Sequence, residues 1–93
     1  IDKSPPDFMI ISNGKDVSKE KIINIKTDSF LEIKGIDNSS GVKEILYSYD
    51  EKIFYIYEDG IYISDKKPFK LYFKLIDNVG NTTPLNIIEI LPQ

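Results

Sequence analysis

The chain has 93 residues, 41% of them hydrophobic and 29% charged, and its formal net charge is −3. This length suits one domain and is too short for two self-sufficient cores. The sequence has no cysteine and no histidine, which excludes disulfides, thiolate metal sites and a histidine general base and leaves oxygen ligands for any ion. It also has no arginine, and its lysines are scattered, so it lacks the clustered cations of nucleic-acid-binding proteins.

The first residues are polar and contain Pro5 and Pro6, which is typical of a linker. We therefore expect residues 1–7 to connect to a preceding module and residues 8–93 to form a single domain. No apolar run approaches the ~20 residues that a membrane-spanning helix needs, so we expect no membrane insertion.

Short segments rich in Ile, Tyr, Phe and Leu recur every ~8–12 residues, separated by turn-forming pairs such as Asn-Gly, Asp-Asn and Asp-Gly. No helical period is sustained, so the pattern predicts an all-β fold. Seven or eight short strands over this length favour a two-sheet sandwich. In chain order, the predicted strands are Phe8–Ser12, Lys21–Lys26, Ser29–Ile36, Val42–Tyr49, Phe54–Glu58, Ile61–Ser64, Pro68–Asp77 and Leu85–Leu91.

Alternation along the strands predicts which side chains face the core, because successive residues point to opposite faces of a sheet. In the segment 69–77 the apolar residues are the odd-numbered ones, which leaves Lys70 and Lys74 facing water. The predicted core positions are Leu31, Ile33, Gly35, Ile45, Tyr47, Phe69, Leu71, Phe73 and Leu75, and Tyr49 is a further candidate.

Three short motifs carry a resemblance to a known family. They are Ser40-Gly41-Val42-Lys43-Glu44-Ile45, Tyr47-Ser48-Tyr49-Asp50 and Asp77-Asn78-Val79-Gly80-Asn81. Their order resembles the immunoglobulin-like and OmpL47-type modules repeated along bacterial surface proteins. The similarity covers roughly residues 30–83, and the family's usual glycine and aromatic residue after the second motif are replaced by Glu51-Lys52-Ile53-Phe54.

The resemblance implies an immunoglobulin-like Greek-key sandwich on a cell surface or in a secreted protein. Its implied role is a non-catalytic spacer or stalk, or a protein-interaction unit of the adhesin type. The implied partners are neighbouring modules of the same chain and a host or cell-wall protein or polysaccharide. Catalysis is not expected, because no histidine or cysteine is available and the adjacent carboxylates of Glu58 and Asp59 should point apart.

Asp37 and Asp77 both fall on the inward phase of their strands, one step beyond the last core residue. A buried carboxylate needs partners, and two arrangements would supply them. In the first, each aspartate accepts hydrogen bonds from the N–H groups of its own turn. In the second, a Ca²⁺ ion is held by Asp37, Asp77 and loop carbonyls, with Asn78 or Asp7 as a further ligand. No other cofactor is expected.

The six tyrosines allow a second function, a carbohydrate-binding accessory module of a secreted enzyme, because their rings offer flat apolar faces and hydroxyls. On strand phase, the rings expected to face a ligand are Tyr55, Tyr57 and Tyr72. The alternative is that they only stabilise the sheet through cross-strand pairs.

Overall fold

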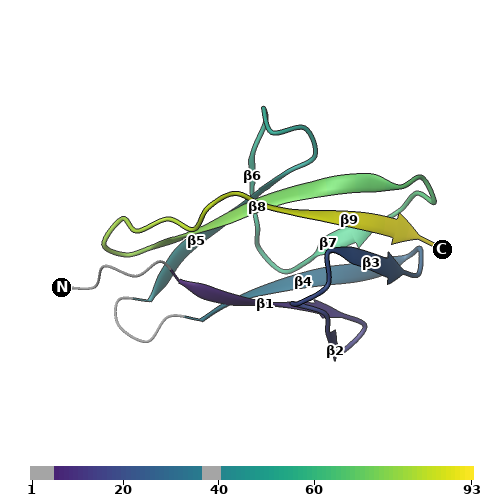
Figure 1. Cartoon of the computed structure of the whole chain (residues 1–93), viewed down its shortest axis with the longest axis horizontal. Coiled ribbons are helices and arrows are strands. Elements are labelled where there is room, and N and C mark those ends of the chain that lie inside the picture. The colour runs from purple at the N-terminus through teal and green to yellow at the C-terminus, as the bar shows by residue number, and fades with distance from the viewer. Residues whose placement is uncertain (1–5, 37–40) are drawn as a thin grey trace.

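The computed structural model describes residues 6–36 and 41–93, which form two sheets packed face to face (Figure 1). Eight of the strands match the predicted ones to within a few residues, and the ninth is an additional two-residue strand. The strands are β1 (Asp7–Ser12), β2 (Lys15–Asp16), β3 (Ile22–Ile25), β4 (Ser29–Ile36), β5 (Val42–Ser48), β6 (Tyr55–Ile56), β7 (Ile61–Ile63), β8 (Phe69–Asp77) and β9 (Asn86–Pro92).

One sheet has the order β2-β1-β4-β7 and the other the order β3-β9-β8-β5-β6. The runs β1-β4-β7 and β9-β8-β5 correspond to the A-B-E and G-F-C runs of an immunoglobulin domain, with β6 added beside the C strand. Two segments, β1 and β3, share the role of the A strand. β1 pairs antiparallel with β4 in one sheet, and β3 pairs parallel with β9 in the other. The predicted immunoglobulin-like sandwich is therefore confirmed.

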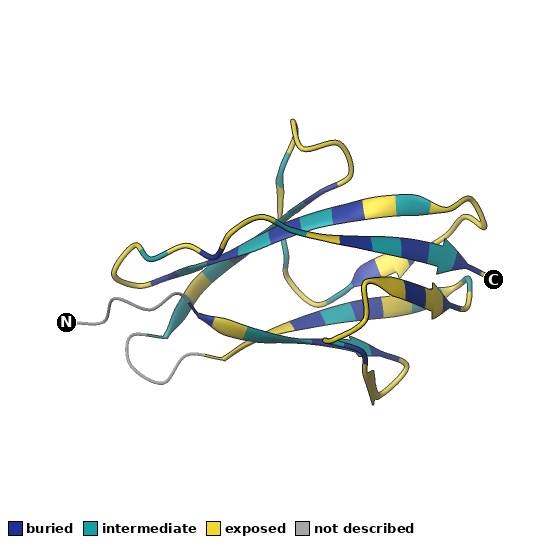
Figure 2. Cartoon of the chain, in the orientation of Figure 1, coloured by how far each residue is buried: buried dark blue, intermediate teal, exposed yellow. Residues whose placement is uncertain are grey.

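The core lies between the sheets and consists of alternate residues of the long strands (Figure 2). In β8, Leu71, Phe73 and Leu75 are all fully buried, and Leu31 and Ile33 face them from β4. The Phe73 ring meets that of Phe8 edge to face, with centroids 5.1 Å apart, which joins the two sheets. The predicted inward phases are confirmed for β8 and for Leu31 and Ile33 of β4, whereas Gly35, also predicted in the core, is exposed.

Gly35 shows why a glycine stands on this inward phase. A Cβ atom at this position would lie 2.6 Å from Cγ2 of Val42, well inside van der Waals contact. Since the branched valine side chain cannot swing away, only glycine allows β4 and the start of β5 to approach this closely.

Two features at the start of the chain differ from the prediction. β1 begins at Asp7 and Pro6 is already buried, so the sandwich includes the end of the segment assigned to the linker. β2 was not predicted, although its signal is present in the sequence. Asn13 and Gly14 adopt positive φ angles of 52° and 80°, which a tight two-residue hairpin turn between Ser12 and Lys15 requires.

We expect Phe73→Ala to lower the free energy of unfolding by about 3–5 kcal/mol, because it leaves a cavity against the Phe8 ring at the centre of the core. Lys70→Ala, an exposed position on the same strand, should change it by less than ~0.5 kcal/mol. Urea unfolding of the two variants measures both values. Equal, small losses would show that the face assigned to β8 is wrong.

Candidate functional site

The turn between β8 and β9 is organised around the carboxylate of Asp77, which is fully buried. Its Oδ1 accepts hydrogen bonds from the N–H groups of Val79 at 3.0 Å and Asn81 at 2.8 Å, and its Oδ2 accepts one from Nδ2 of Asn81 at 2.9 Å. Gly80, with φ of 92°, completes the bend. The local hydrogen bonds predicted for this aspartate are present.

The Asp77 turn lies at the end of the sandwich where β5 begins. Asp77 pairs with Val42, and the N–H of Asn78 donates to the carbonyl oxygen of Gly41 at 3.1 Å. Asp37, the other aspartate of the calcium hypothesis, lies outside the described residues. Among residues 6–36 and 41–93, no three acidic side chains gather in a way that could hold a metal ion. The Ca²⁺ site therefore stays a prediction, and the contacts of Asp77 favour turn closure.

We expect millimolar Ca²⁺ to leave the melting temperature of the domain unchanged, because both carboxylate oxygens of Asp77 already accept hydrogen bonds within the turn. Calorimetric titration and a melting curve with and without the ion measure this, with Mg²⁺ as the control. A saturable rise in melting temperature with Ca²⁺ alone would establish the ion site instead.

A second turn, at the opposite end of β5, gives a physical meaning to the Tyr47–Asp50 motif. The Oγ of Ser48 accepts hydrogen bonds from the N–H groups of Asp50 and Glu51 and donates one to Oδ1 of Asp50 at 3.0 Å. That same Oδ1 accepts hydrogen bonds from the N–H groups of Lys52 at 2.9 Å and Ile53 at 3.0 Å. Serine and aspartate at this spacing therefore close the turn that leads into β6.

Hydrogen bonds from the N–H groups of Ile53 and Lys52 and from the Ser48 hydroxyl hold the pKa of Asp50 below its usual value. The folded state therefore releases the proton of this carboxyl more readily than the unfolded state does. The resulting stabilisation is present above the unfolded-state pKa and is lost as the pH falls through the folded-state pKa.

We therefore expect Asp50→Ala to reduce the loss of stability that the domain suffers between about pH 5 and about pH 2. Urea midpoints measured across this range compare the variant with the parent chain. The matched control is Asp59→Ala, an exposed aspartate whose carboxylate accepts no hydrogen bond from the described residues. If both variants keep the acid profile of the parent, Asp50 does not contribute to it.

Four tyrosines gather where β5 and β6 pair. Register places Tyr55 opposite Tyr47 with their ring centroids 5.6 Å apart, and the Tyr49 ring lies 6.2 Å from Tyr55 and 5.5 Å from Phe69. Tyr49 and Tyr55 are each 47% exposed. Burial, with smaller effects of Tyr47 and Tyr55, raises the pKa of Tyr49. We call Tyr47, Tyr49, Tyr55 and Tyr57 the tyrosine cluster.

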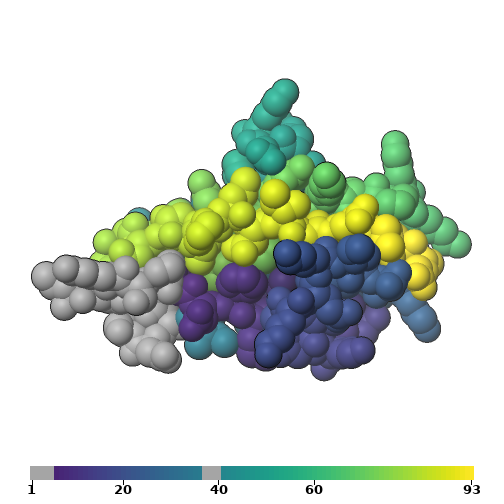
Figure 3. Space-filling model, in the orientation of Figure 1, coloured from purple at the N-terminus to yellow at the C-terminus, as the bar shows by residue number. Residues whose placement is uncertain are grey.

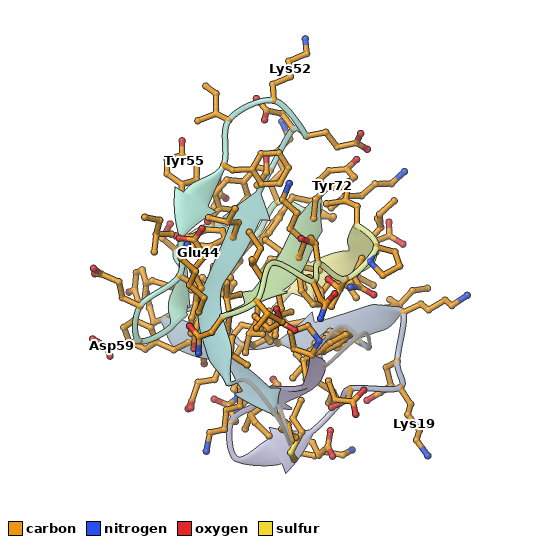
Figure 4. All side chains as sticks on the ribbon, turned by 90° about the vertical axis from the view of Figure 1, so that its left-hand side faces the viewer. Lys19, Glu44, Lys52, Tyr55, Asp59 and Tyr72 are labelled. Carbon is orange, nitrogen blue, oxygen red and sulfur yellow. The ribbon has the colours of Figure 1, made fainter. Side chains whose placement is uncertain are left out.

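The structure separates the three rings that the sequence assigned to a ligand. Tyr55 is exposed as predicted. The expected exposure of Tyr57 is wrong, because its ring packs against the core and its hydroxyl accepts a hydrogen bond from the N–H of Ile33 at 3.1 Å. Tyr72 is half-buried on the outer face of its sheet, and Figure 4 shows its ring diverging from that of Tyr55.

The prediction for Tyr57 fails because the sequence suggested the wrong inward phase for β6 and the residues around it. Leu46 pairs with Ile56 and Tyr47 with Tyr55, so Ile56 faces outward, at 64% exposure, and Tyr55 shares the face of Tyr47. Apolar residues alone suggest the reverse phase for this segment. The turn closed by Ser48 and Asp50 sets the register that decides it.

Sequence reasoning also missed the exposure of Tyr49 and a surface pair on the other sheet. The Tyr62 hydroxyl donates a 2.6 Å hydrogen bond to Oδ1 of Asp28, which raises the pKa of Tyr62, and its ring lies 5.1 Å from that of Phe30. Strand phase does place Phe30 and Tyr62 opposite each other on the outer face, which is the signal that was available.

No family model and no curated protein sequence matches the chain. Among solved structures, the chain is similar over its whole length to part of the extracellular domain of a protein described as a one-component system from B. thetaiotaomicron. The TM-score is 0.64 at 10% sequence identity, and the match covers 100% of this chain and 16% of that one. This similarity shows the fold alone. Over residues 6–36 and 41–93 there is no helix that could cross a lipid bilayer.

Proposed function

We propose that the chain is a non-catalytic immunoglobulin-like module of a larger bacterial surface or secreted protein, acting as a spacer or protein-interaction unit. The observation that carries the proposal is the path of the chain through the sandwich. β1 starts at one end of the long axis and β9 finishes at the other, so modules joined in series would add length (Figure 1).

Three further features support a self-contained module of a longer protein. The whole chain corresponds to 16% of a much longer chain described as an extracellular domain. Its core holds together without disulfides, through the buried aliphatic residues and the Phe8–Phe73 contact between the sheets. Two of the three motifs of the OmpL47-type resemblance close the turns after β5 and β8, which is a structural use of those residues.

The carbohydrate-binding alternative is supported by one observation, the exposed rings of Tyr49 and Tyr55 side by side in the tyrosine cluster. Aromatic faces of this kind stack on the apolar faces of sugar rings. Tyr72 does not belong to this surface, so a platform built from Tyr55, Tyr57 and Tyr72 together is not available.

Small-angle scattering of two copies joined end to end tests the spacer role. We expect the maximum dimension to rise by close to the 44 Å long axis of one module, with the melting temperature of the single module retained. A much smaller increase would mean that the copies fold back on each other, which contradicts a spacer. Binding to a polysaccharide that is lost in both Tyr49→Ala and Tyr55→Ala would favour the alternative.

A further inference from the structure

A pocket of about 390 Å³ opens between the edge strands β2 and β3. It arises because the chain leaves one sheet after β2 and joins the other at β3, so the sheets part on this side of the sandwich. In Figure 3 the two segments adjoin in purple and dark blue, below the yellow β9. The lining residues all come from positions 12–24 and are Ser12, Asn13, Lys15, Val17, Glu20, Ile23 and Asn24.

The hydroxyl of Ser12 distinguishes this pocket from an ordinary surface depression. Ser12 is only 8% exposed, on the inward phase of β1, and its side chain forms no hydrogen bond with the described residues. The other buried polar side chains have partners: Ser48 and Asp77 close turns, and Thr83 accepts the N–H of Leu75 at 3.0 Å. A buried hydroxyl without a partner is costly and requires an explanation.

Hydrogen bonds of Ser18 hold one wall of the pocket in place, and Ser12 takes no part in them. Oγ of Ser18 accepts the N–H of Ile10 at 2.9 Å and donates to the carboxylate of Asp16, and the Ser18 N–H donates to the same carboxylate at 2.9 Å. These bonds fix the bend that carries Val17 and Glu20. A pocket shaped in advance loses less conformational entropy when a ligand binds.

The polar groups around the rim are varied and their charges balance. Lys15 supplies an ammonium donor, Glu20 a carboxylate acceptor, and Asn13 an amide that can do both. Asn24 accepts a hydrogen bond from Gln93 through Oδ1 at 2.9 Å, which orients its Nδ2 donor. Val17 and Ile23 are buried and form an apolar floor.

We propose that this pocket binds a short neutral saccharide of one or two rings, with the Ser12 hydroxyl as its buried hydrogen-bond partner. Sugar hydroxyls both donate and accept, which matches a rim of amides, one ammonium and one carboxylate, and a C–H face of the ring can lie on the apolar floor. The volume lies near the lower end of the ~300–1,000 Å³ typical of small-ligand pockets. The site is remote in sequence from the tyrosine cluster and does not rest on the spacer role.

The first test is stability. Ser12→Ala removes a hydroxyl without a protein partner, so we expect its melting temperature to equal or exceed that of the parent chain. Ser48→Ala removes the acceptor of two N–H groups and should lower it. If Ser12→Ala is destabilised as much as Ser48→Ala, the hydroxyl has a structural role and the proposal is overturned.

The second test is an NMR titration of the ¹⁵N-labelled chain with cellobiose, maltose and N,N′-diacetylchitobiose, and with glycine and glutamate as zwitterionic probes. We expect one of the disaccharides to shift the amide signals of residues 12–24 saturably, with a Kd of about 1 mM. Ser12→Ala should weaken this binding by about tenfold. Tyr55→Ala, outside the pocket, should leave it unchanged.

Three results would overturn the proposal. Shifts centred on Tyr49 and Tyr55 that disappear in Tyr55→Ala would place sugar binding on the tyrosine cluster instead. Saturable shifts with glycine or glutamate alone would show that the pocket takes a zwitterion through Lys15 and Glu20. No shift with any probe at about 50 mM would mean that the pocket holds water only.

Discussion

The alternation of β8 is the constraint on which the other features depend. Leu71, Phe73, Leu75 and Asp77 occupy one phase of this central strand, and all four are fully buried. The first three form the middle of the core. Because Asp77 shares their phase, its carboxylate enters the end of the sandwich and must be satisfied there, which the turn to β9 achieves through N–H groups and an amide. The opposite phase sends Tyr72 to the outer face, away from Tyr55.

The long strands could be predicted because burial of one face leaves a period of two in the sequence, and β4 and β8 show this period clearly. The phase of β6 could not be predicted in this way. Its two residues, Tyr55 and Ile56, are both apolar enough for either face, so the hairpin register determines which of them faces the core side. That register depends on side chains of Ser48 and Asp50 binding backbone N–H groups, which no hydrophobic pattern records.

For buried polar residues too, the sequence predicts some of the hydrogen bonding and not the rest. Asp77 was predictable as a site of hydrogen bonding, since a carboxylate on an inward phase must find donors. Ser12 also falls on an inward phase, but a serine there commonly bonds to a neighbouring backbone group, and only the structure shows that it does not. The pocket beside it depends on the passage of the chain from one sheet to the other between β2 and β3. That passage is a property of topology, not of any local motif.

The exposure of the tyrosine cluster has a topological origin as well. Residues 57–60 connect β6 directly to β7, so within the described chain the four-stranded sheet ends at β7 while the facing sheet continues to β6. Tyr57 follows β6 and extends toward the four-stranded sheet, where its hydroxyl accepts the N–H of Ile33. Ile33 lies beyond the part of β4 that pairs with the three-residue β7. Tyr55 lies on the edge strand β6 and Tyr49 just after β5, and both stay half-exposed. The aromatic surface is therefore a consequence of a short connection, and it gains a function only if a ligand covers it.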